Sequence, residues 1–294
     1  MKKSLLALLL LVSFLCVWAS YNYNRVYIDS TFKIWGLLRS FPGDQQTKEN
    51  IRQQFAIVML RREDADLGES LLEILPVINR GDPLAVVLDL DISLTSEDEM
   101  AVSEEKLQLA FDAIGKKLVW VYNEENEGIK KILRNENKED YFPLGFTNII
   151  TGKIGAIELT LFEPCKVING VAVPHLVVLA WEISRGLYSL PYHTDCKRWE
   201  EEYLWLPKID VGGAFYIPVV FFGKNNFFKK ISDASLLDGT TNSEELRGKI
   251  VLVGTTRAEE SGHIDKHILP NVGEMDGTEI LANAIATIIS VASQ

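Results

Sequence analysis

The chain has 294 residues with a formal net charge of -11, and 47% of its residues are hydrophobic while 24% are charged. This balance is typical of one large packed domain or two ordinary ones, and it excludes a disordered chain. The excess of acidic residues argues against nucleic acid as a partner and against a surface held on anionic lipid by charge alone.

The N-terminus predicts a membrane helix. Lys2 and Lys3 precede an apolar run over residues 5–19, an order that fits either a retained signal anchor or a cleaved secretory signal. The aromatic residues that follow the run favour retention, because such residues gather at the membrane interface. We therefore expect residues 1–23 to anchor the chain and residues 24–294 to form an extracytoplasmic domain, either periplasmic or at the cell surface.

The first half of the chain alternates strand and helix patterns. Apolar runs over residues 56–60, 84–91 and 117–122 predict buried strands. Helices are predicted between them, over residues 69–79 and 96–114. Two consecutive strand–helix–strand units imply a parallel sheet with helices against its faces.

The second half is less regular. Its predicted elements are a charged surface helix and loop over 124–140, β-rich segments over 145–162 with a turn at Thr151 and Gly152, a helix over 175–186, a β-rich insertion over 190–213, strands over 216–222 and 248–254, and a helix over 277–291. The predicted fold class is therefore α/β, with a largely parallel sheet flanked by helices, a β-rich insertion and an N-terminal membrane helix.

Two cysteines lie beyond the apolar run, at Cys165 and Cys196. In an oxidising compartment they can form a disulfide. The alternative is a pair of free, buried thiols, and the sequence spacing leaves both open because it does not establish geometry.

Three stretches carry a resemblance to a known family. The first is an Asp-containing helix over residues 29–35 that follows the predicted membrane helix, with predicted strands over 56–60 and 86–89 after it. The other two lie in the second half of the chain. Residues 144–148 read Leu-Gly-Phe-Thr-Asn and are followed by a helix that opens at Pro174. Residues 246–256 read Leu-Arg-Gly-Lys-Ile-Val-Leu-Val-Gly-Thr-Thr, and residues 275–284 read Met-Asp-Gly-Thr-Glu-Ile-Leu-Ala-Asn-Ala. Together they resemble the CHASE domain of type two, an extracellular sensory domain associated with cyclases and histidine kinases. The chain departs from the family at residues 61–64, where Arg-Arg-Glu-Asp follows the first strand.

The resemblance implies a sensory domain rather than an enzyme, with no cofactor. The stimulus would be a small molecule or a physical stress, and the response would pass to a cytoplasmic effector in the same chain or in a partner protein. Since the sequence stops at Gln294, we expect either a truncated receptor or a sensor that works through a partner. The alternatives are a secreted α/β hydrolase-like enzyme and a structural interaction module of the cell envelope.

Four residues are candidates for ligand contact. Asp89 and Asp91 end a predicted strand, and ligands of parallel sheets bind at the carboxyl ends of the strands. The two alternate along the strand, so they point to opposite faces, and either can instead cap a following helix. Thr255 and Asp265 follow the last predicted strand, in the stretch with the most specific family resemblance.

Two further patterns resemble chemical sites. His263, Asp265 and His267 have the residue types of a metal site, but their alternating spacing in a loop favours a solvated segment. Lys249 begins a strand rather than a helix, which argues against a phosphate-binding loop, and Gly254 is interpreted as permitting a tight turn. We expect no metal ligands and no catalytic residues.

Overall fold

The computed structural model describes residues 45–60, 67–90, 111–121, 144–154, 157–168, 171–187, 209–211, 214–255, 266–269 and 272–292, together with Leu109, Cys196, Lys197 and Trp199. The predicted membrane helix over residues 1–23 lies outside these residues. Within the described ranges, no helix combines the length and the apolar character that a membrane span requires.

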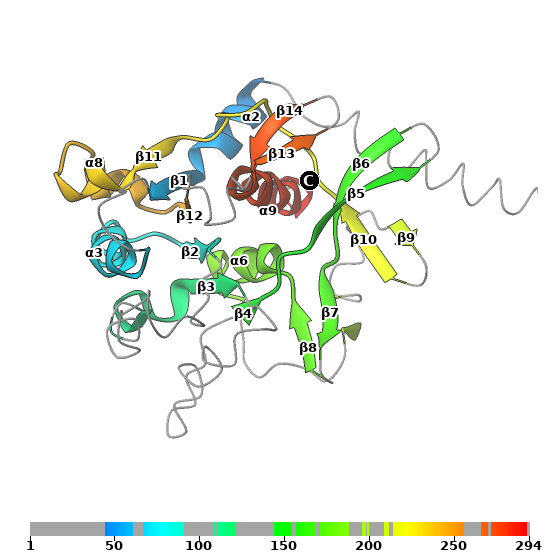
Figure 1. The fold of residues 1–294 in the computed structure, drawn as a ribbon, viewed down its shortest axis with the longest axis horizontal. Helices are drawn as coiled ribbons and strands as arrows, with labels where there is room; N and C mark the ends of the chain where they lie inside the picture. The colour runs from blue at the N-terminus through cyan, green and yellow to red at the C-terminus, as the bar shows by residue number, and fades with distance from the viewer. Residues whose placement is uncertain are drawn as a thin grey trace, which may run out of the picture. The chain divides into compact units, whose positions relative to one another are not determined.

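A parallel sheet forms the centre of the fold. In the described part of the chain it has six strands in the order β11-β1-β12-β2-β3-β4 (Figure 1). In chain order these strands are β1 (Phe55–Leu60), β2 (Ala85–Leu88), β3 (Leu118–Val121), β4 (Leu144–Gly145), β11 (Lys230–Ser232) and β12 (Ile250–Thr255). The last of them, β12, lies between the first two and pairs in parallel with both.

The central strands are buried on both faces. Every residue of β1 and β2 is buried, and so is β12 as far as Gly254. Near-continuous apolar runs suit such strands because helices cover both sides of a parallel sheet. The predicted α/β class with a parallel sheet flanked by helices is confirmed.

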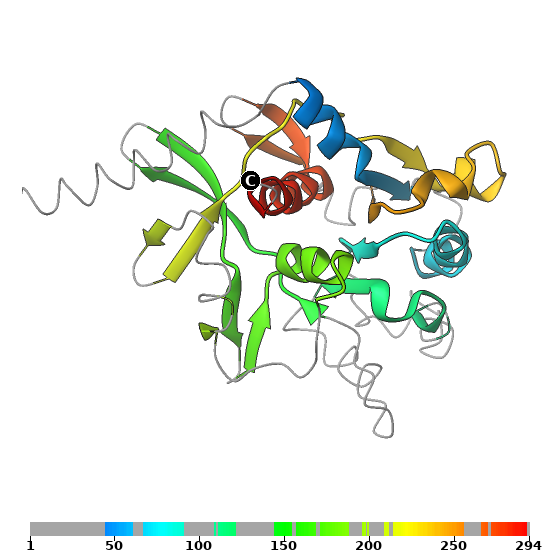
Figure 2. The same cartoon turned by 180° about the vertical axis from the view of Figure 1, so that it is seen from behind.

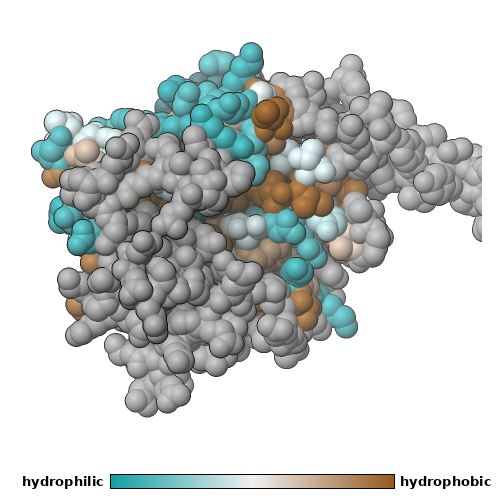
Figure 3. Space-filling model, in the orientation of Figure 1, coloured by the Kyte–Doolittle hydropathy of each residue, from teal (hydrophilic) through white to brown (hydrophobic). Residues whose placement is uncertain are grey.

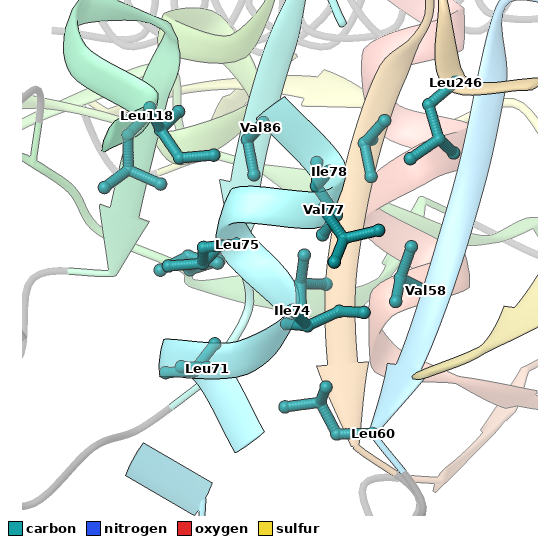
Figure 4. Packing of buried hydrophobic residues seen from close by; sticks show 14 of the residues in the cluster. Val58, Leu60, Leu71, Ile74, Leu75, Val77, Ile78, Val86, Leu118 and Leu246 are labelled. Carbon is teal, nitrogen blue, oxygen red and sulfur yellow. The ribbon is translucent and has the colours of Figure 1, made fainter. Parts of the chain in front are cut away.

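The first face is covered by α3 (Leu67–Arg80), α8 (Asp233–Leu237) and the short helix η2 (Ser243–Leu246). Figure 4 shows α3 beside β12, with Leu75 and Ile78 among the side chains of the buried cluster. Both side chains are fully buried. Pro76 lies inside α3, which corresponds to the helix predicted over residues 69–79.

The second face is covered by α6 (Leu176–Ser184) and α9 (Gly277–Ala292), which pack against each other (Figures 1 and 2). Helix α6 lies against β2, β3 and β4, whereas α9 lies against β12 and β1. Helix α2 (Gln45–Gln53) precedes β1 directly and buries only Ile51.

A separate antiparallel sheet has the order β5-β6-β10-β9. Its strands are β5 (Ile149–Ile154), β6 (Ile157–Phe162), β9 (Ile209–Val211) and β10 (Ala214–Pro218). The turn predicted at Thr151 and Gly152 is wrong, because both residues lie inside β5 and pair with Thr160 and Leu159. The short helix η1 (Gly115–Lys117) precedes β3. Two hairpins are also described: β7 (Cys165–Ile168) with β8 (Val171–Pro174), and β13 (Lys266–Leu269) with β14 (Gly273–Asp276).

A buried polar ladder on α9 replaces part of a predicted strand. The strand expected over 216–222 ends at Pro218, and the chain then runs along α9. The Val220 N–H donates to Thr287 Oγ1 at 2.9 Å and the Phe222 N–H donates to Asn283 Oδ1 at 3.1 Å. Residues 219–227 therefore form a strap along α9. The Val219 N–H still donates to the Thr160 carbonyl of β6, but the N–H groups of Val220 and Phe222 are satisfied by helix side chains.

Glu279 completes the ladder one turn before Asn283. Its carboxylate accepts from the N–H groups of Asn226 and Phe227 at 3.0 and 2.8 Å. It also pairs with Lys230, whose Nζ lies 2.9 Å from Glu279 and 2.6 Å from Asp276. Burial lowers the pKa of Lys230, but the hydrogen bonds to Asp276 and Glu279 outweigh it and hold the pKa above its ordinary value.

Cys165 and Cys196 form a disulfide with a Cα–Cα distance of 5.6 Å, so the open question of their pairing is resolved. The bond joins the first residue of β7 to a segment 31 residues further along the chain.

Replacing Asn283 by alanine is expected to lower the free energy of unfolding by about 2 kcal/mol, because the Phe222 N–H then stays buried without an acceptor. Denaturant unfolding measures the change. Asn50→Ala is the control: Asn50 also accepts a side-chain hydrogen bond, but at the exposed surface of α2, and its loss should cost under about 0.5 kcal/mol. Equal losses for the two variants would contradict a structural role for the ladder.

Removing the disulfide is expected to lower the free energy of unfolding by about 3 kcal/mol, since a bridge over such a separation restricts the unfolded chain. The comparison is denaturant unfolding of the wild type and of a Cys165→Ala, Cys196→Ala variant. Adding a thiol reductant should destabilise the wild type and leave this variant unchanged. A reductant effect of the same size on both would show that the bond contributes nothing.

Candidate ligand-binding site

A cavity of about 330 Å³ lies at the carboxyl edge of the parallel sheet. Four parts of the fold surround it: the end of β2, the segment from β4 into β5 together with β6, the strand β13, and the first turns of α9. This edge is where ligands of open parallel sheets bind, because the loops and helix ends that converge there are free to vary.

The polar part of the lining combines one carboxylate with hydroxyl, amide and imidazole groups. Its members are Asp89, Thr147, Asn148, Thr151, Thr160 and His267. Asp89 is half-buried and Thr160 is buried, whereas the other four polar residues are exposed.

The apolar part of the lining comes from β5, β13 and α9. Its members are Ile149, Ile268, Leu269, Ile280 and Leu281. Ile268 is 87% exposed on the β13–β14 hairpin. In the space-filling view, apolar surface gathers where this hairpin and the β5–β6 strands lie in Figure 1 (Figure 3). The cavity therefore offers hydrocarbon surface beside its polar groups.

Asp89 joins the cavity to α9. Its backbone N–H donates to the Val253 carbonyl of β12, and its Oδ2 accepts from the Thr278 hydroxyl at 2.8 Å. Thr278 is the second residue of α9 and sits directly over Gly254, where an added Cβ would lie 2.1 Å from Thr278 Oγ1. The predicted turn at Gly254 is therefore wrong: this glycine belongs to β12 and is needed for the close approach of α9.

The wall formed by residues 145–148 rests on His175. An added Cβ on Gly145 would lie 2.7 Å from the Leu176 backbone, so glycine allows β4 to meet the start of α6. The His175 ring contacts the Phe146 ring at a centroid distance of 5.0 Å. Its Nδ1 faces the Val177 N–H at 3.2 Å and caps α6, while Nε2 faces the Asn148 N–H at 3.3 Å.

Burial lowers the pKa of His175 to about 3. The ring is fully buried, and removing an imidazolium from water is costly. A neutral imidazole has one unprotonated nitrogen, so each tautomer accepts from one of the two N–H groups. Protonation would turn an N–H donor toward both of them. His175 is therefore a neutral structural support for the cavity wall.

The four predicted ligand residues have different places. Asp89 lines the cavity. Thr255 ends β12 outside the lining and donates from its hydroxyl to the Leu60 carbonyl at 3.2 Å, while Asp91 and Asp265 lie outside the described residues. Ligand contact by Asp89 stays a prediction: the structure places its side chain in the lining, bonded to Thr278.

Of the three residues in the metal hypothesis, the structure describes only His267. Within the ranges that the structure describes, no three His, Cys, Asp or Glu side chains are grouped to hold an ion. His267 lines the cavity, and His263 lies outside the described residues.

Sequence reasoning missed most of the cavity wall. Residues 147 and 148 lie in a stretch that was noted for its family resemblance and not as a site. The sequence predicts a turn at Thr151 and a helix over residues 277–291, without indicating that either lines a cavity. The sequence holds no local signal for these residues, because the pairing of β12 with β2, which brings the chain back beside Asp89, joins segments more than 160 residues apart.

The CHASE2 domain family model matches residues 45–294. The chain therefore belongs to the CHASE2 domain family, whose members are extracellular sensory domains rather than catalytic ones. No curated protein and no solved structure matches the chain at a significant level. The family resemblance of the three sequence stretches is confirmed.

The His175 pKa predicts acid sensitivity. The pKa is about 3 in the folded protein against 6.5 as an ordinary value, so between these two pH values the unfolded state binds more protons. The contribution of His175 is complete above pH 6.5 and declines as the pH falls toward 3, by up to about 1.4 kcal/mol per pH unit.

The variant His175→Asn isolates this contribution, because asparagine can cap α6 but does not titrate in this range. Its unfolding free energy should fall less steeply between pH 6.5 and about 4 than that of the wild type. Denaturant unfolding at several pH values measures both slopes. Parallel slopes would refute the assignment, whatever the stability of the variant at neutral pH.

Proposed function

We propose that this chain is the extracytoplasmic sensory part of a membrane signalling protein and that its cavity receives a small-molecule stimulus. The observation that carries the proposal is the position of the cavity, at the carboxyl edge of the sheet of a CHASE2 domain and in contact with the start of α9. The Cys165–Cys196 disulfide supports an oxidising compartment.

Residues 1–23 anchor this domain in the membrane. Two lysines before an apolar run favour an orientation with the start of the chain inside the cell and the rest of it outside. The response passes to a cytoplasmic effector, carried by the same polypeptide or by a partner protein.

Helix α9 is the element that responds to the ligand. A ligand shifts an equilibrium only through a difference in its affinity for two arrangements. Asp89 provides that difference, because a ligand that bonds its carboxylate competes with Thr278, the residue that ties the start of α9 to β2. A shift of α9 then changes its ladder to the strap formed by residues 219–227.

A thermal-shift screen of the full chain in detergent, using a library of small metabolites, tests this function. We expect at least one compound to raise the melting temperature of the wild type, because binding to the folded state alone stabilises it. The same compound should fail on Thr147→Trp, which places an indole at the cavity mouth. Val167→Trp, at an exposed position on β7, is the matched control and should respond like the wild type.

Hydrogen exchange on the bound wild type tests transmission to α9. The strap N–H groups that donate to Asn283 and Thr287 should change their hydrogen-exchange rates when the compound binds. A compound that stabilises the Thr147→Trp variant as well as the wild type would place binding outside the cavity. Binding in the cavity without any change in strap exchange would refute α9 as the responding element.

A further inference from the structure

The strap of residues 219–227 divides its backbone hydrogen bonds between a wall of the cavity and α9. The Val219 N–H donates to the Thr160 carbonyl of β6 at 2.8 Å, and Thr160 is a buried residue of the cavity lining. The next N–H along the strap, on Val220, donates to Thr287 Oγ1 of α9 at 2.9 Å. Neighbouring N–H groups of the strap therefore join β6 to α9 within one residue of chain.

The strap also contacts the apolar wall of the cavity. Phe221 packs against a buried cluster formed by Leu269, Met275 and Ile280. Leu269 on β13 and Ile280 on α9 both line the cavity. The strap consequently lies behind two parts of the lining, the β6 wall and the apolar wall, so that a displacement of either wall reaches it directly.

The hydrogen bonds on the α9 side of the strap are linked to one another. The Thr287 hydroxyl donates to the Asn283 carbonyl at 2.8 Å, and the Asn283 side-chain amide donates to the Glu279 carbonyl at 2.8 Å. All three side chains are fully buried. Releasing one strap N–H alone would leave it and its helix acceptor buried without each other, and an unsatisfied buried group is costly. We therefore expect the strap to dock on α9, or to leave it, as one unit.

We propose that the strap is a two-position element that couples the β6 wall of the cavity to the second half of α9, an inference that rests on the proposed function. A ligand that displaces β6 moves Val219 with it, because the Val219 N–H is bonded to that strand. This motion draws the following N–H groups away from Thr287 and Asn283. The cavity thereby acts on α9 at two places, on its first turn through Thr278 and on its second half through the strap.

Hydrogen exchange of the full chain in detergent, with no compound added, tests whether the strap moves as a unit. Thr287→Val removes the acceptor of the Val220 N–H and leaves the acceptors of Phe222, Asn226 and Phe227 in place. We expect exchange at all four N–H groups to accelerate together by about tenfold, because an unsatisfied buried N–H destabilises the docked position by an amount of that order.

Ser184→Ala is the control for the loss of a hydroxyl. Like Thr287, Ser184 donates to a carbonyl of its own helix, but it belongs to α6, and its loss should leave strap exchange at the wild-type rates. Acceleration confined to Val220 would overturn the two-position strap, since it would show release of one residue at a time. If Thr287→Val does not fold, a denaturant series on the wild type decides the question. The four N–H groups should then share one opening free energy below that of global unfolding, and four different values would overturn the proposal.

A substitution inside the cavity tests the coupling to the β6 wall. Thr151 lines the cavity on β5 and pairs in register with Thr160, so Thr151→Trp places an indole beside the residue whose carbonyl holds Val219. Exchange at the strap N–H groups that bond α9 should become at least about threefold faster. Val167→Trp, at an exposed position of β7, should leave these rates unchanged. Unchanged or slower strap exchange in Thr151→Trp would overturn the coupling.

Failure of this inference is distinct from failure of the proposed function, because these exchange measurements use no ligand. A compound screen without a cavity-dependent hit would remove the small-molecule stimulus and leave the strap results standing. Strap N–H groups that open independently, or that ignore the Thr151→Trp indole, would remove the strap as a coupling element and leave binding in the cavity in place.

Discussion

The ladder of polar side chains on α9 is the interaction on which the rest of the structure depends. Glu279, Asn283 and Thr287 lie on one stripe of the helix, all fully buried. Such groups destabilise a core unless each is paired. They are paired with the strap of residues 219–227, so helix and strap can hold their positions only together. The same helix meets the sheet at Gly254 and borders the cavity with its first turns. The packing against the sheet and the cavity wall therefore both depend on where the helix lies.

The sequence allowed the parallel sheet to be predicted more fully than its surroundings. The runs at 56–60, 84–91 and 248–254 are continuous and apolar because these strands are covered on both faces. The apolar run at 216–222 has the same appearance, but its last amides bond to helix side chains that lie about 60 residues later. An apolar run indicates that its residues are buried, but it does not indicate which groups accept hydrogen bonds from their backbone N–H groups. The sequence therefore predicts β10 too long and does not reveal the strap.

Part of the candidate site was also predictable from the strand pattern. Asp89 was found because it ends a recognisable strand at the edge where ligands bind. The walls from β5, β6 and β13 come from strands paired outside the parallel sheet, and no local pattern announces that they converge. Thr278 and Gly254 were invisible as a pair, since their contact joins two segments of an α/β fold that only the packing of α9 brings together. The contacts made by the start of α9 thus become intelligible only when β2 and β12 are considered with it.

The position of β12 has a consequence for how the molecule is made. Strands β1 and β2 are never direct neighbours, because residues 250–255 fill the space between them. Until residues 250–255 have been synthesised, the facing edges of both strands stay unpaired. Strands β2, β3 and β4 are neighbours and can pair earlier, but β1 is joined to them only through β12. The parallel sheet is therefore completed by a strand that comes from the last fifth of the chain.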